Sequence, residues 1–326
     1  MMEKLRITRF GNGFILSFKG IKVALDKVSD RKVDYHFISH AHMDHLPRKP
    51  CGKVLASSET IKLASERGMT CNEDIKEVRG LDLVNSGHIL GSRALLIEDK
   101  ILYTGDLNIR DRLFIKGFKT PRVEILIMEA TYGREKYVFD EFGKLVEKSL
   151  KYVLEAVSSG RNVLLIGHSL GKAQLLTKLF SWYDGLIVDE NVWRYNRIYE
   201  ELGVNLGSYV SFKNSLRRNL LRRNGWLMIA SKNSMRMELA RKYNALTVEF
   251  TGWAENPGYQ YWAGVDKSFS LSDHADFKDL IKIVEEAQPS EVYIAYGFSE
   301  EFSSALRRRG FKAVPLPPNQ RRIVEF

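Results

Sequence analysis

The stretch Ser39-His40-Ala41-His42-Met43-Asp44-His45-Leu46 decides how the rest of the 326-residue sequence is interpreted. It directly follows a short apolar run that is typical of a β-strand. In extended or turn backbone, side chains two residues apart project the same way, so His40 and His42 can bind one ion. Asp44 and His45, across the turn, can bind another. Neutral imidazole and carboxylate are typical ligands of zinc and similar divalent ions.

Further residues of metal-binding type stand where other predicted strands end. His88 follows one predicted strand, Asp106 ends the next, and Asp26 ends an earlier one. A His-rich solvated loop would explain two clustered histidines alone, but it does not explain this wider set. The sequence therefore predicts a site for two metal ions. His36 lies within the preceding strand and outside the motif, so we expect a packing or surface role for it.

Composition limits the class of protein. Lys and Arg number 50 against 40 Asp and Glu, and the net charge of +10 permits a polyanionic partner without requiring one. The two cysteines, Cys51 and Cys71, exclude a disulfide scaffold and a Cys-rich zinc module, and they fit the reducing cytoplasm where we expect the protein. The sequence contains no run of about 18 apolar residues, so it predicts no membrane-spanning helix. The opening MMEKLRITRF lacks the apolar core of a secretory signal.

The predicted secondary structure changes along the chain. The first part is dominated by short strands, whereas strands alternate with helices of about ten residues after Tyr132, which is typical of a doubly wound parallel sheet. We therefore expect one α/β domain made of residues 1–133 and 263–326. A second α/β domain, residues 134–262, is inserted into it.

The motifs together resemble a known family. His-x-His-x-Asp-His with a later lone His and a later Asp resembles the metallo-β-lactamase fold. The continuation resembles the β-CASP branch of nucleases, which includes the pre-mRNA 3′-end cleaving subunit and Artemis-type DNA nucleases. That branch has an acidic residue at a strand end, here Glu129, and a His in a Ser-x-His-x-Asp stretch, here Ser272-Asp273-His274-Ala275-Asp276. The resemblance covers essentially the whole chain and implies an αββα sandwich with an inserted Rossmann-like (β-CASP) α/β domain.

The resemblance also implies roles for these residues. His40, His42 and His88 would hold the first ion, Asp44 and His45 the second, and Asp106 would bridge them. Asp26 would orient ligands without binding an ion. Two divalent ions, zinc or else manganese, would activate a water. Glu129 would hold His274 for delivery of a proton to the leaving oxygen. The expected catalytic residues are Asp44, Glu129 and His274.

One position departs from the family pattern. RNA-cutting relatives have a His-Gly pair at the end of the penultimate strand, as a further ligand of the second ion, where this sequence reads Tyr296-Gly297. A phenol titrates near ~10 and is a poor zinc ligand at neutral pH. DNA-cutting relatives usually have Val there, so Tyr296 matches neither pattern. We place Tyr296 among the substrate-binding residues and take it as a narrow preference for DNA over RNA.

A competing motif is Gly167-His168-Ser169-Leu170-Gly171, which fits the Gly-x-Ser-x-Gly nucleophile elbow between a strand and a helix. A serine hydrolase is disfavoured because the sequence has no His-Gly-Gly-Gly stretch and because His274, the only later histidine, is assigned elsewhere. The motif more simply forms a tight turn or a helix start that contacts a substrate phosphate. Because Gly171-Lys172-Ala173-Gln174 matches the family's Gly-Lys/Arg-Ala-Gln, we expect Ser169 and Lys172 to bind substrate.

The insert is strongly basic. Residues 213–242 hold nine Lys or Arg and one acidic residue, Glu238, and a basic helix is expected over Asn214–Arg223. Aromatic residues follow this segment, a combination that suits single-stranded nucleic acid. We expect a cleft between the domains to hold the strand. The residues expected to bind its backbone are Arg217, Arg218, Arg222 and Arg223.

The leading prediction is a metal-dependent nuclease of single-stranded nucleic acid, with a narrow preference for DNA over RNA and for exonuclease over endonuclease cleavage. One alternative is a small-molecule hydrolase of the metallo-β-lactamase fold, which would not need the basic insert. Another is a catalytically silent nucleic-acid-binding subunit. We expect no membrane association, and a protein partner could select the target.

Overall fold

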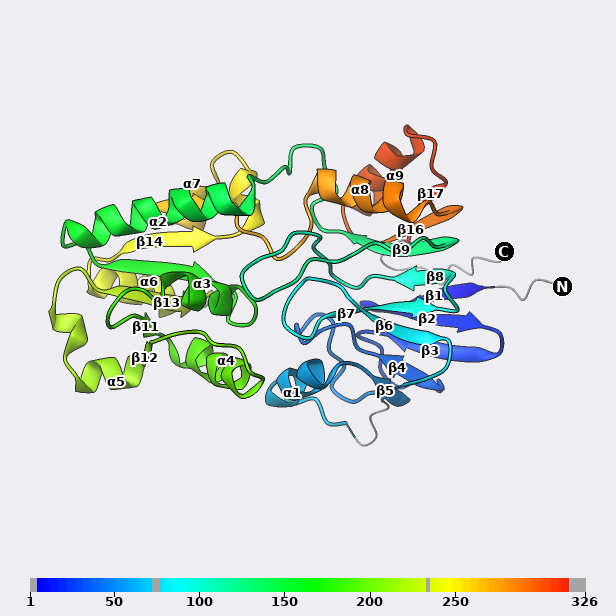
Figure 1. The fold of residues 1–326 in the computed structure, drawn as a ribbon, viewed down its shortest axis with the longest axis horizontal. Coiled ribbons are helices and arrows are strands. Elements are labelled where there is room, and N and C mark those ends of the chain that lie inside the picture. Colours follow the sequence, from blue (N-terminus) through cyan, green and yellow to red (C-terminus); the bar gives the residue numbers. More distant parts are fainter. Residues whose placement is uncertain (1–4, 72–76, 233–234, 317–326) are drawn as a thin grey trace. The chain divides into compact units, whose positions relative to one another are not determined.

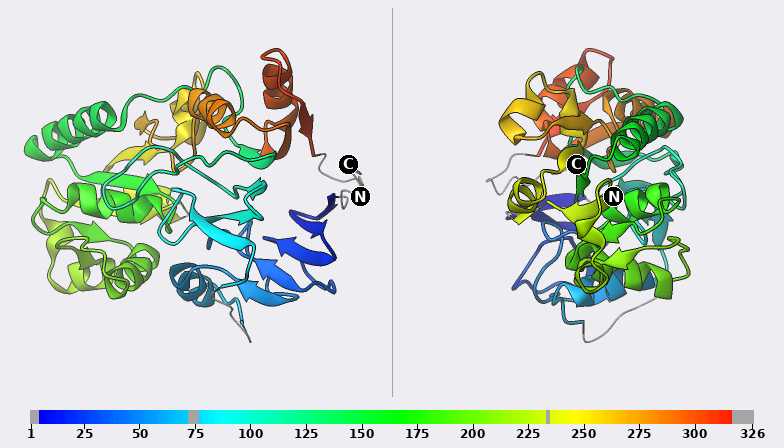
Figure 2. Two further views of the ribbon diagram at one scale, coloured as in Figure 1. Left: turned by 45° about the vertical axis from the view of Figure 1, so that its right-hand side comes forward. Right: turned by 90° about the vertical axis from the view of Figure 1, so that its left-hand side faces the viewer.

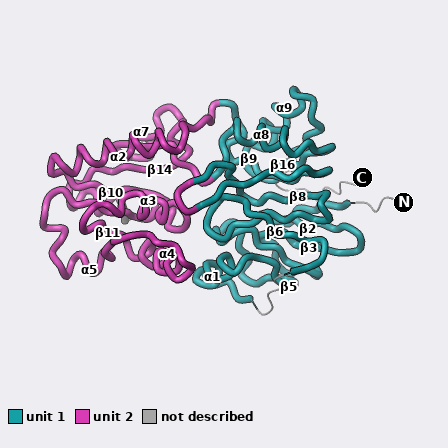
Figure 3. Tube along the Cα trace, viewed as in Figure 1, with its two compact units in different colours: residues 1–111, 115–135, 274–326 teal, residues 112–114, 136–273 magenta. Residues whose placement is uncertain are grey.

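The computed structural model describes residues 5–71, 77–232 and 235–316, and the chain forms two compact units (Figure 3). Unit 1 comprises residues 1–111, 115–135 and 274–326. Unit 2 comprises residues 112–114 and 136–273. The mixed α/β class predicted from the sequence is confirmed. No helix among the described residues is long and apolar enough to cross a membrane.

Unit 1 contains two sheets. The first has the order β1-β2-β3-β4-β5, antiparallel from β1 to β3 and parallel from β3 to β5. Its strands are β1 (Arg6–Phe10), β2 (Gly13–Phe18), β3 (Ile21–Leu25), β4 (Tyr35–Phe37) and β5 (Lys53–Leu55). The second has the order β17-β16-β9-β8-β7-β6. Its strands are β6 (Leu81–Asn85), β7 (Arg93–Ile97), β8 (Ile101–Tyr103), β9 (Ile125–Ala130), β16 (Glu291–Gly297) and β17 (Ala313–Pro315).

The two sheets of unit 1 pack face to face. Phe14, Leu25 and Phe37 of the first sheet share one buried core with residues such as Ile127 and Tyr293 of the second. Alternate residues of the second sheet point the other way, into a core with α8 (Phe277–Ala287) and α9 (Ser299–Arg307), which cover its outer face (Figure 1). This arrangement follows from the two-residue period of strands that are buried on both sides. Helix α1 (Ser58–Glu66) follows β5 and is capped by Ser57.

Unit 2 is a doubly wound parallel sheet with the order β12-β11-β13-β10-β14-β15. Its strands are β10 (Val163–Gly167), β11 (Ile187–Val188), β12 (Val210–Ser211), β13 (Leu227–Ser231), β14 (Leu246–Phe250) and β15 (Lys267–Phe269). Helices pack on both faces, as the views in Figures 1 and 2 show. One face carries α2 (Phe142–Ser158), α3 (Lys172–Phe180) and α4 (Glu190–Glu201). The other carries α5 (Phe212–Arg217), α6 (Met235–Lys242) and α7 (Tyr259–Ala263).

Two details of unit 2 differ from expectation. Strand β15 pairs with β14, so residues 267–269 belong to the sheet of unit 2, whereas the expected insert boundary at 262 leaves them out. The basic helix expected over 214–223 is wrong in extent, because α5 ends at Arg217. Asn219 is left-handed, with φ of 54°, and a short 3₁₀ turn, η1 (Leu220–Arg222), follows it. A left-handed residue interrupts the helical hydrogen bonds, and Asn tolerates that conformation.

The core of unit 2 gives a direct test of this packing. Phe180 is fully buried at the end of α3, with its ring 6.3 Å from that of Phe250. Phe180→Ala should lower the free energy of unfolding of this unit by about 3–5 kcal/mol, because it leaves a cavity. Trp182→Ala, two residues on and 49% exposed, is the matched control and should cost less than about 1 kcal/mol. Urea denaturation measures both, and an equal effect of the two would contradict the packing.

Candidate metal centre

The His-rich loop of unit 1 is held in place by Asp26. This residue directly follows β3 in a left-handed conformation, with φ of 58°, which an Asp tolerates. Its Oδ1 accepts from the Ser39 backbone N–H at 2.7 Å, and its Oδ2 accepts from the Ser39 hydroxyl at 2.9 Å and the Tyr103 hydroxyl at 2.6 Å. The same Oδ2 lies 2.8 Å from Nδ1 of His45. The carboxylate therefore fixes both ends of the segment 39–45 that carries the motif.

Four possible metal-ligand atoms lie close together at this loop. His40, His42, His88 and Asp106 each offer one atom to a group in which all atoms lie within 4.8 Å of one another. Nε2 of His40 is 3.4 Å and Nε2 of His88 is 3.6 Å from Asp106 Oδ2, and His88 Nε2 is 3.1 Å from His42 Nδ1. Bonds of ~2.0–2.1 Å in a tetrahedron place ligand atoms about 3.4 Å apart. The spacing therefore fits a divalent ion.

The state of His40 supports the same conclusion. Its ring is fully buried, and its Nε2 has no hydrogen-bond partner among the residues that the structure describes. Burial lowers the pKa of His40 well below its ordinary value, so the imidazole is neutral and has a free lone pair. An unsatisfied buried nitrogen costs free energy that a bound cation would recover. A His/Asp cluster that can bind metal is therefore present.

Asp106 lies at the centre of this cluster. It follows β8 by way of Gly105, which has φ of 54° and whose missing Cβ would come within 2.6 Å of the Ser39 Cβ. Any larger residue at 105 would therefore displace the Asp26-bound loop. Although burial opposes ionisation, the adjacent histidines, His45 first among them, hold the pKa of Asp106 well below its usual range. The carboxylate is thus ionised and ready to accept a cation.

The residues expected to hold a second ion are arranged less closely. His45 Nε2 is 3.3 Å from the other oxygen of Asp106, Oδ1. Asp44 is exposed and joins neither cluster of possible metal ligands that the described residues form. Tyr296 lies beside this pair, with its ring 5.2 Å from that of His45, and its hydroxyl donates to the Asn12 carbonyl at 2.8 Å. The structure thus pairs His45 with Asp106 but does not bring Asp44 to them.

Glu129 and His274 form the second element of the site. Glu129 is buried at the end of β9, where Oε1 accepts from the Leu107 N–H at 2.8 Å and Oε2 from the N–H and hydroxyl of Thr131. His274 Nδ1 lies 2.8 and 2.9 Å from the two carboxylate oxygens. Because the carboxylate only accepts, Nδ1 carries the proton and donates. His274 Nε2 then faces Asp106, 3.9 Å from Oδ2.

Asn108 links the loops that carry these residues, and no motif in the sequence marks it. Its side-chain Nδ2 donates to the His274 carbonyl at 2.9 Å, and its backbone N–H donates to the Ser86 carbonyl at 3.0 Å. It stands two residues after Asp106, and Ser86 stands two residues before His88. Gly87 packs so closely that a Cβ there would lie 2.2 Å from the Asn108 carbonyl oxygen. Asn108 therefore positions the loops of His88, Asp106 and His274 at once.

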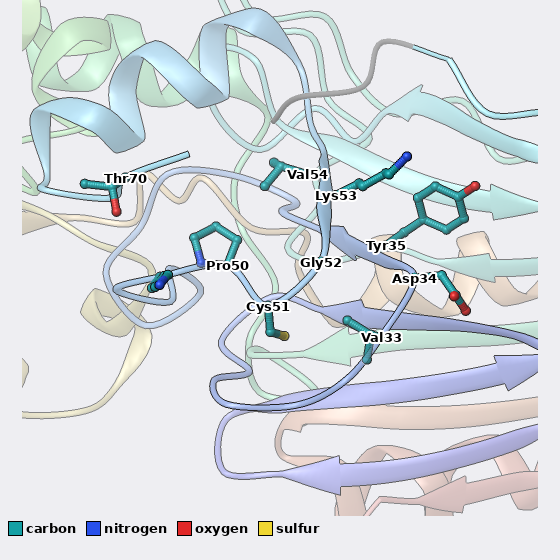
Figure 4. Close-up of a pocket in the computed structure, with 10 residues that line it drawn as sticks. Val33, Asp34, Tyr35, Pro50, Cys51, Gly52, Lys53, Val54 and Thr70 are labelled. Carbon is teal, nitrogen blue, oxygen red and sulfur yellow. The ribbon is translucent and has the colours of Figure 1, made fainter. Parts of the chain in front are cut away.

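His36, expected to have a packing or surface role, is fully buried in β4. Its Nε2 donates to the Asp26 carbonyl at 2.5 Å, and its Nδ1 accepts from the Cys51 N–H at 3.1 Å. Cys51 and Tyr35 line a cavity of about 620 Å³ in unit 1 (Figure 4), and none of its lining residues is a candidate metal ligand. The His36 ring therefore links the Asp26 carbonyl to the Cys51 backbone N–H.

In unit 2, Lys172 is buried. Its ammonium donates to the Leu271 carbonyl at 2.6 Å and to Asp273 Oδ1 at 3.0 Å. Arg112 binds the same carboxylate oxygen at 3.2 Å. Asp273 immediately precedes His274 in the chain. Lys172 thus secures the segment that leads to His274, and its predicted contact with substrate would require this ammonium to exchange partners.

The remaining predicted substrate contacts lie in different places. Ser169 is half-buried in the β10–α3 turn, where its carbonyl accepts from Gln174 Nε2 at 3.0 Å. The side chains of Arg217, Arg218, Arg222 and Arg223 are exposed. They lie at the end of α5 and in the segment that leads from it to β13, whereas Ser169 and Lys172 follow β10. The structure therefore separates the arginines from the Ser169 turn within unit 2.

Comparison with known proteins places the fold and the motifs in a family. No protein-family profile matches the chain. A probable DNA ligase of Opitutus terrae is 32% identical over 295 residues, which are 85% of this chain and 28% of that protein. An RNase J-like protein of Methanocaldococcus jannaschii is 24% identical over 239 residues, which are 60% of this chain and 55% of that protein. The chain belongs to the β-CASP branch of the metallo-β-lactamase fold. The family resemblance predicted from the motifs is thereby confirmed.

A solved structure shows how much of this β-CASP chain the fold covers. A protein of unknown function from Enterococcus faecalis V583 superposes with a TM-score of 0.67 at 14% identity, over 99% of this chain and 100% of that one. At that identity the likeness concerns the fold alone. The chain spans only 28% and 55% of the length of the two curated relatives named above.

The buried Lys172 predicts an unusual dependence of stability on pH. Burial lowers the pKa of Lys172 from 10.5 to about 8, against the opposing pull of Asp273. Between these values the unfolded chain binds a proton that the folded chain does not, so folding becomes more favourable as pH rises from about 8 to about 10.5. Relative to Lys172→Met, the wild type should gain up to about 3 kcal/mol across this window. Urea denaturation measures the free energy of unfolding of both proteins at each pH. If the two free energies change with pH in the same way, the assignment is contradicted.

Proposed function

We propose that the chain is a metal-dependent nuclease that hydrolyses phosphodiester bonds of single-stranded nucleic acid. One observation carries the proposal: Asp106 is shared between the cluster with His40, His42 and His88 and the pair formed by Glu129 and His274. Ions held there would lower the pKa of a water and neutralise charge on a phosphoryl oxygen. Zinc suits the His-rich donor set best, and manganese is the alternative.

The chain's own residues provide the proton transfer. Glu129 fixes the tautomer of His274, with the proton on Nδ1 directed at the carboxylate. Nε2 is then the atom that exchanges a proton with the reacting oxygens, and it faces Asp106 at 3.9 Å. Asn108 holds the backbone of His274, and Glu129 holds its ring. General acid–base catalysis of this kind contributes about 10²–10⁴-fold in rate.

We assign a second ion to His45 and Asp106, with the exposed Asp44 of the same loop as its third ligand. The support is the 3.3 Å separation of His45 Nε2 from Asp106 Oδ1. Two ions sharing one carboxylate is the arrangement typical of phosphodiester hydrolysis. Tyr296 borders this pair. It would present a hydroxyl group to the substrate where RNA-cutting relatives have a histidine that binds the second ion.

DNA is narrowly favoured over RNA as the substrate, and exonucleolytic cleavage is narrowly favoured over endonucleolytic cleavage. A relative whose printed name is a probable DNA ligase contains a region similar to 85% of this chain, which supports a DNA substrate. The RNase J-like relative supports RNA as the competing substrate. A cytoplasmic location and a protein partner that selects targets stay predictions from the sequence.

The proposal is tested with a cleavage panel. End-labelled single- and double-stranded DNA and RNA are incubated with zinc, manganese or a chelator. We expect single-stranded DNA to be shortened from an end, only in the presence of metal. Asp106→Asn should abolish cleavage, and His274→Ala should slow it about 10²–10⁴-fold without reducing bound zinc. Ser169→Ala is the control for the competing motif: it should retain metal-dependent cleavage at saturating substrate, with any loss confined to substrate affinity.

The outcomes separate the alternatives. Equal products from the wild type and Asp106→Asn would refute metal-dependent cleavage. Bound zinc and bound oligonucleotide with no cleavage of any strand would identify a silent binding subunit. Loss of activity in Ser169→Ala, with the metal ligands dispensable, would identify a serine hydrolase.

A further inference from the structure

The sheet of unit 2 has two edges of different chemistry. All six strands are parallel, so their carboxyl ends meet at one edge and their amino ends at the other. We call the second of these the amino edge. Ser169 and Lys172 follow β10 and therefore lie at the carboxyl edge. Leu271 and Asp273, which Lys172 binds, lie there as well.

The four arginines of the basic segment lie toward the amino edge. Ser211 ends β12 level with Ile229 of β13, in the middle of the sheet, and it caps α5, which runs back from there toward the start of β13 (Figure 1). Arg217 and Arg218 therefore stand at the end of α5 that is directed toward the amino edge. Arg222 and Arg223 come just before β13, which begins at Leu227. The strands between the edges are up to five residues long, so the edges are about 16 Å apart.

Hydrogen bonds fix the end of the arginine segment. The Gly225 N–H donates to Asn162 Oδ1 at 3.0 Å, and Asn162 immediately precedes β10. The Tyr183 hydroxyl donates to the Gly225 carbonyl, and Tyr183 lies shortly before β11. Both partners stand at the amino ends of their strands. The residues just before Gly225 are thereby tied to that edge.

These arginines carry unneutralised charge. All four are exposed, and none of their guanidinium groups has a carboxylate partner within residues 5–71, 77–232 and 235–316. The sequence has no Asp or Glu between Glu201 and Glu238. Other exposed cations at the same edge are Arg161, Arg241 and Lys242, against the exposed carboxylates Glu155, Asp184 and Asp266. A surplus of positive charge therefore remains at this edge.

The kind of partner follows from the side chains. A guanidinium presents a planar fork of N–H donors that matches a phosphate, and a row of them releases counterions from a nucleic-acid backbone. Trp182, 49% exposed, precedes β11 at the same edge and offers a ring on which a base can stack. Cations beside an exposed aromatic ring suit a strand of nucleic acid better than an acidic protein, which has no bases to stack.

We propose that the amino edge of the unit 2 sheet, with Arg217, Arg218, Arg222 and Arg223, is a binding surface for the phosphate backbone of nucleic acid, separate from the carboxyl edge. The choice of nucleic acid as partner rests on the proposed function. This surface gives long strands a second point of attachment. Short strands that reach only one edge gain nothing from it.

The test compares two neutralised proteins that lack added metal, so that binding is measured without cleavage. One variant carries Arg217→Gln, Arg218→Gln, Arg222→Gln and Arg223→Gln. The matched control neutralises four exposed cations of unit 1 that lie outside the site: Lys22→Gln, Lys119→Gln, Arg122→Gln and Lys278→Gln. Thermal unfolding and circular dichroism establish that both variants fold. Fluorescence anisotropy then follows binding of labelled single strands of about 6 and about 30 nucleotides over a salt titration.

We expect the arginine variant to bind the long strand at least about tenfold more weakly, with a slope of log K against log salt shallower by about 3, since each lost phosphate contact on a single strand contributes about 0.7. Its binding of the short strand, and the control's binding of both, should equal the wild type. An unchanged slope on the long strand overturns the proposal. Equal loss on polyglutamate would replace nucleic acid by an acidic protein as the partner.

The result is independent of cleavage. A wild type that cleaves nothing, with length-dependent binding lost in the arginine variant, would contradict the proposed nuclease function and support this surface. A wild type that cleaves, with an arginine variant that binds and cleaves long strands normally, would support the nuclease function and contradict this surface.

Discussion

The site depends on one buried carboxylate, that of Asp106. Four imidazole rings, those of His40, His45, His88 and His274, place a nitrogen within 3.9 Å of its oxygens. Several histidines around a single buried carboxylate would be an unstable arrangement if more than one of them were charged. A bound cation resolves this conflict, because neutral imidazoles and an ionised carboxylate are the states that it requires.

The surrounding structure is organised to hold that carboxylate and its partners. Asp26 fixes the loop that supplies His40, His42 and His45, and Asn108 joins the loops of His88, Asp106 and His274. Such supporting contacts orient metal ligands and tune their basicity. In unit 2, Lys172 and Arg112 hold Asp273, the neighbour of His274 in the chain. Within unit 1, Glu129 holds the His274 ring itself through Nδ1.

The sequence predicted the features that depend on spacing. The His-x-His-x-Asp-His stretch and the lone His88 are predicted because metal-binding residue types follow strand ends. The pair Glu129 and His274 is predicted by the family resemblance, which also supplies the expected role of each residue. The alternation of strands and helices likewise predicted a doubly wound sheet in the insert. These features depend on local pattern, which a single sequence contains.

Other features could not be found in this way. Asn108, Ser39 and Tyr103 act through single hydrogen bonds to residues distant in the chain, and no spacing marks them. The burial of Lys172 depends on where Leu271 and Asp273 come to lie. The end of α5 depends on one left-handed residue, Asn219, within a sequence of good helix formers. The separation of the arginines from the Ser169 turn follows from the direction of the strands.

The central claim is that four side chains of unit 1 form a metal site around Asp106. The most direct test is anomalous diffraction at the zinc edge from crystals of the zinc-loaded protein. A peak about 2.0–2.2 Å from His40 Nε2, His42 Nδ1, His88 Nε2 and Asp106 Oδ2 is the predicted result. Crystals with zinc bound elsewhere, or with no ordered zinc near Asp106, would contradict the account.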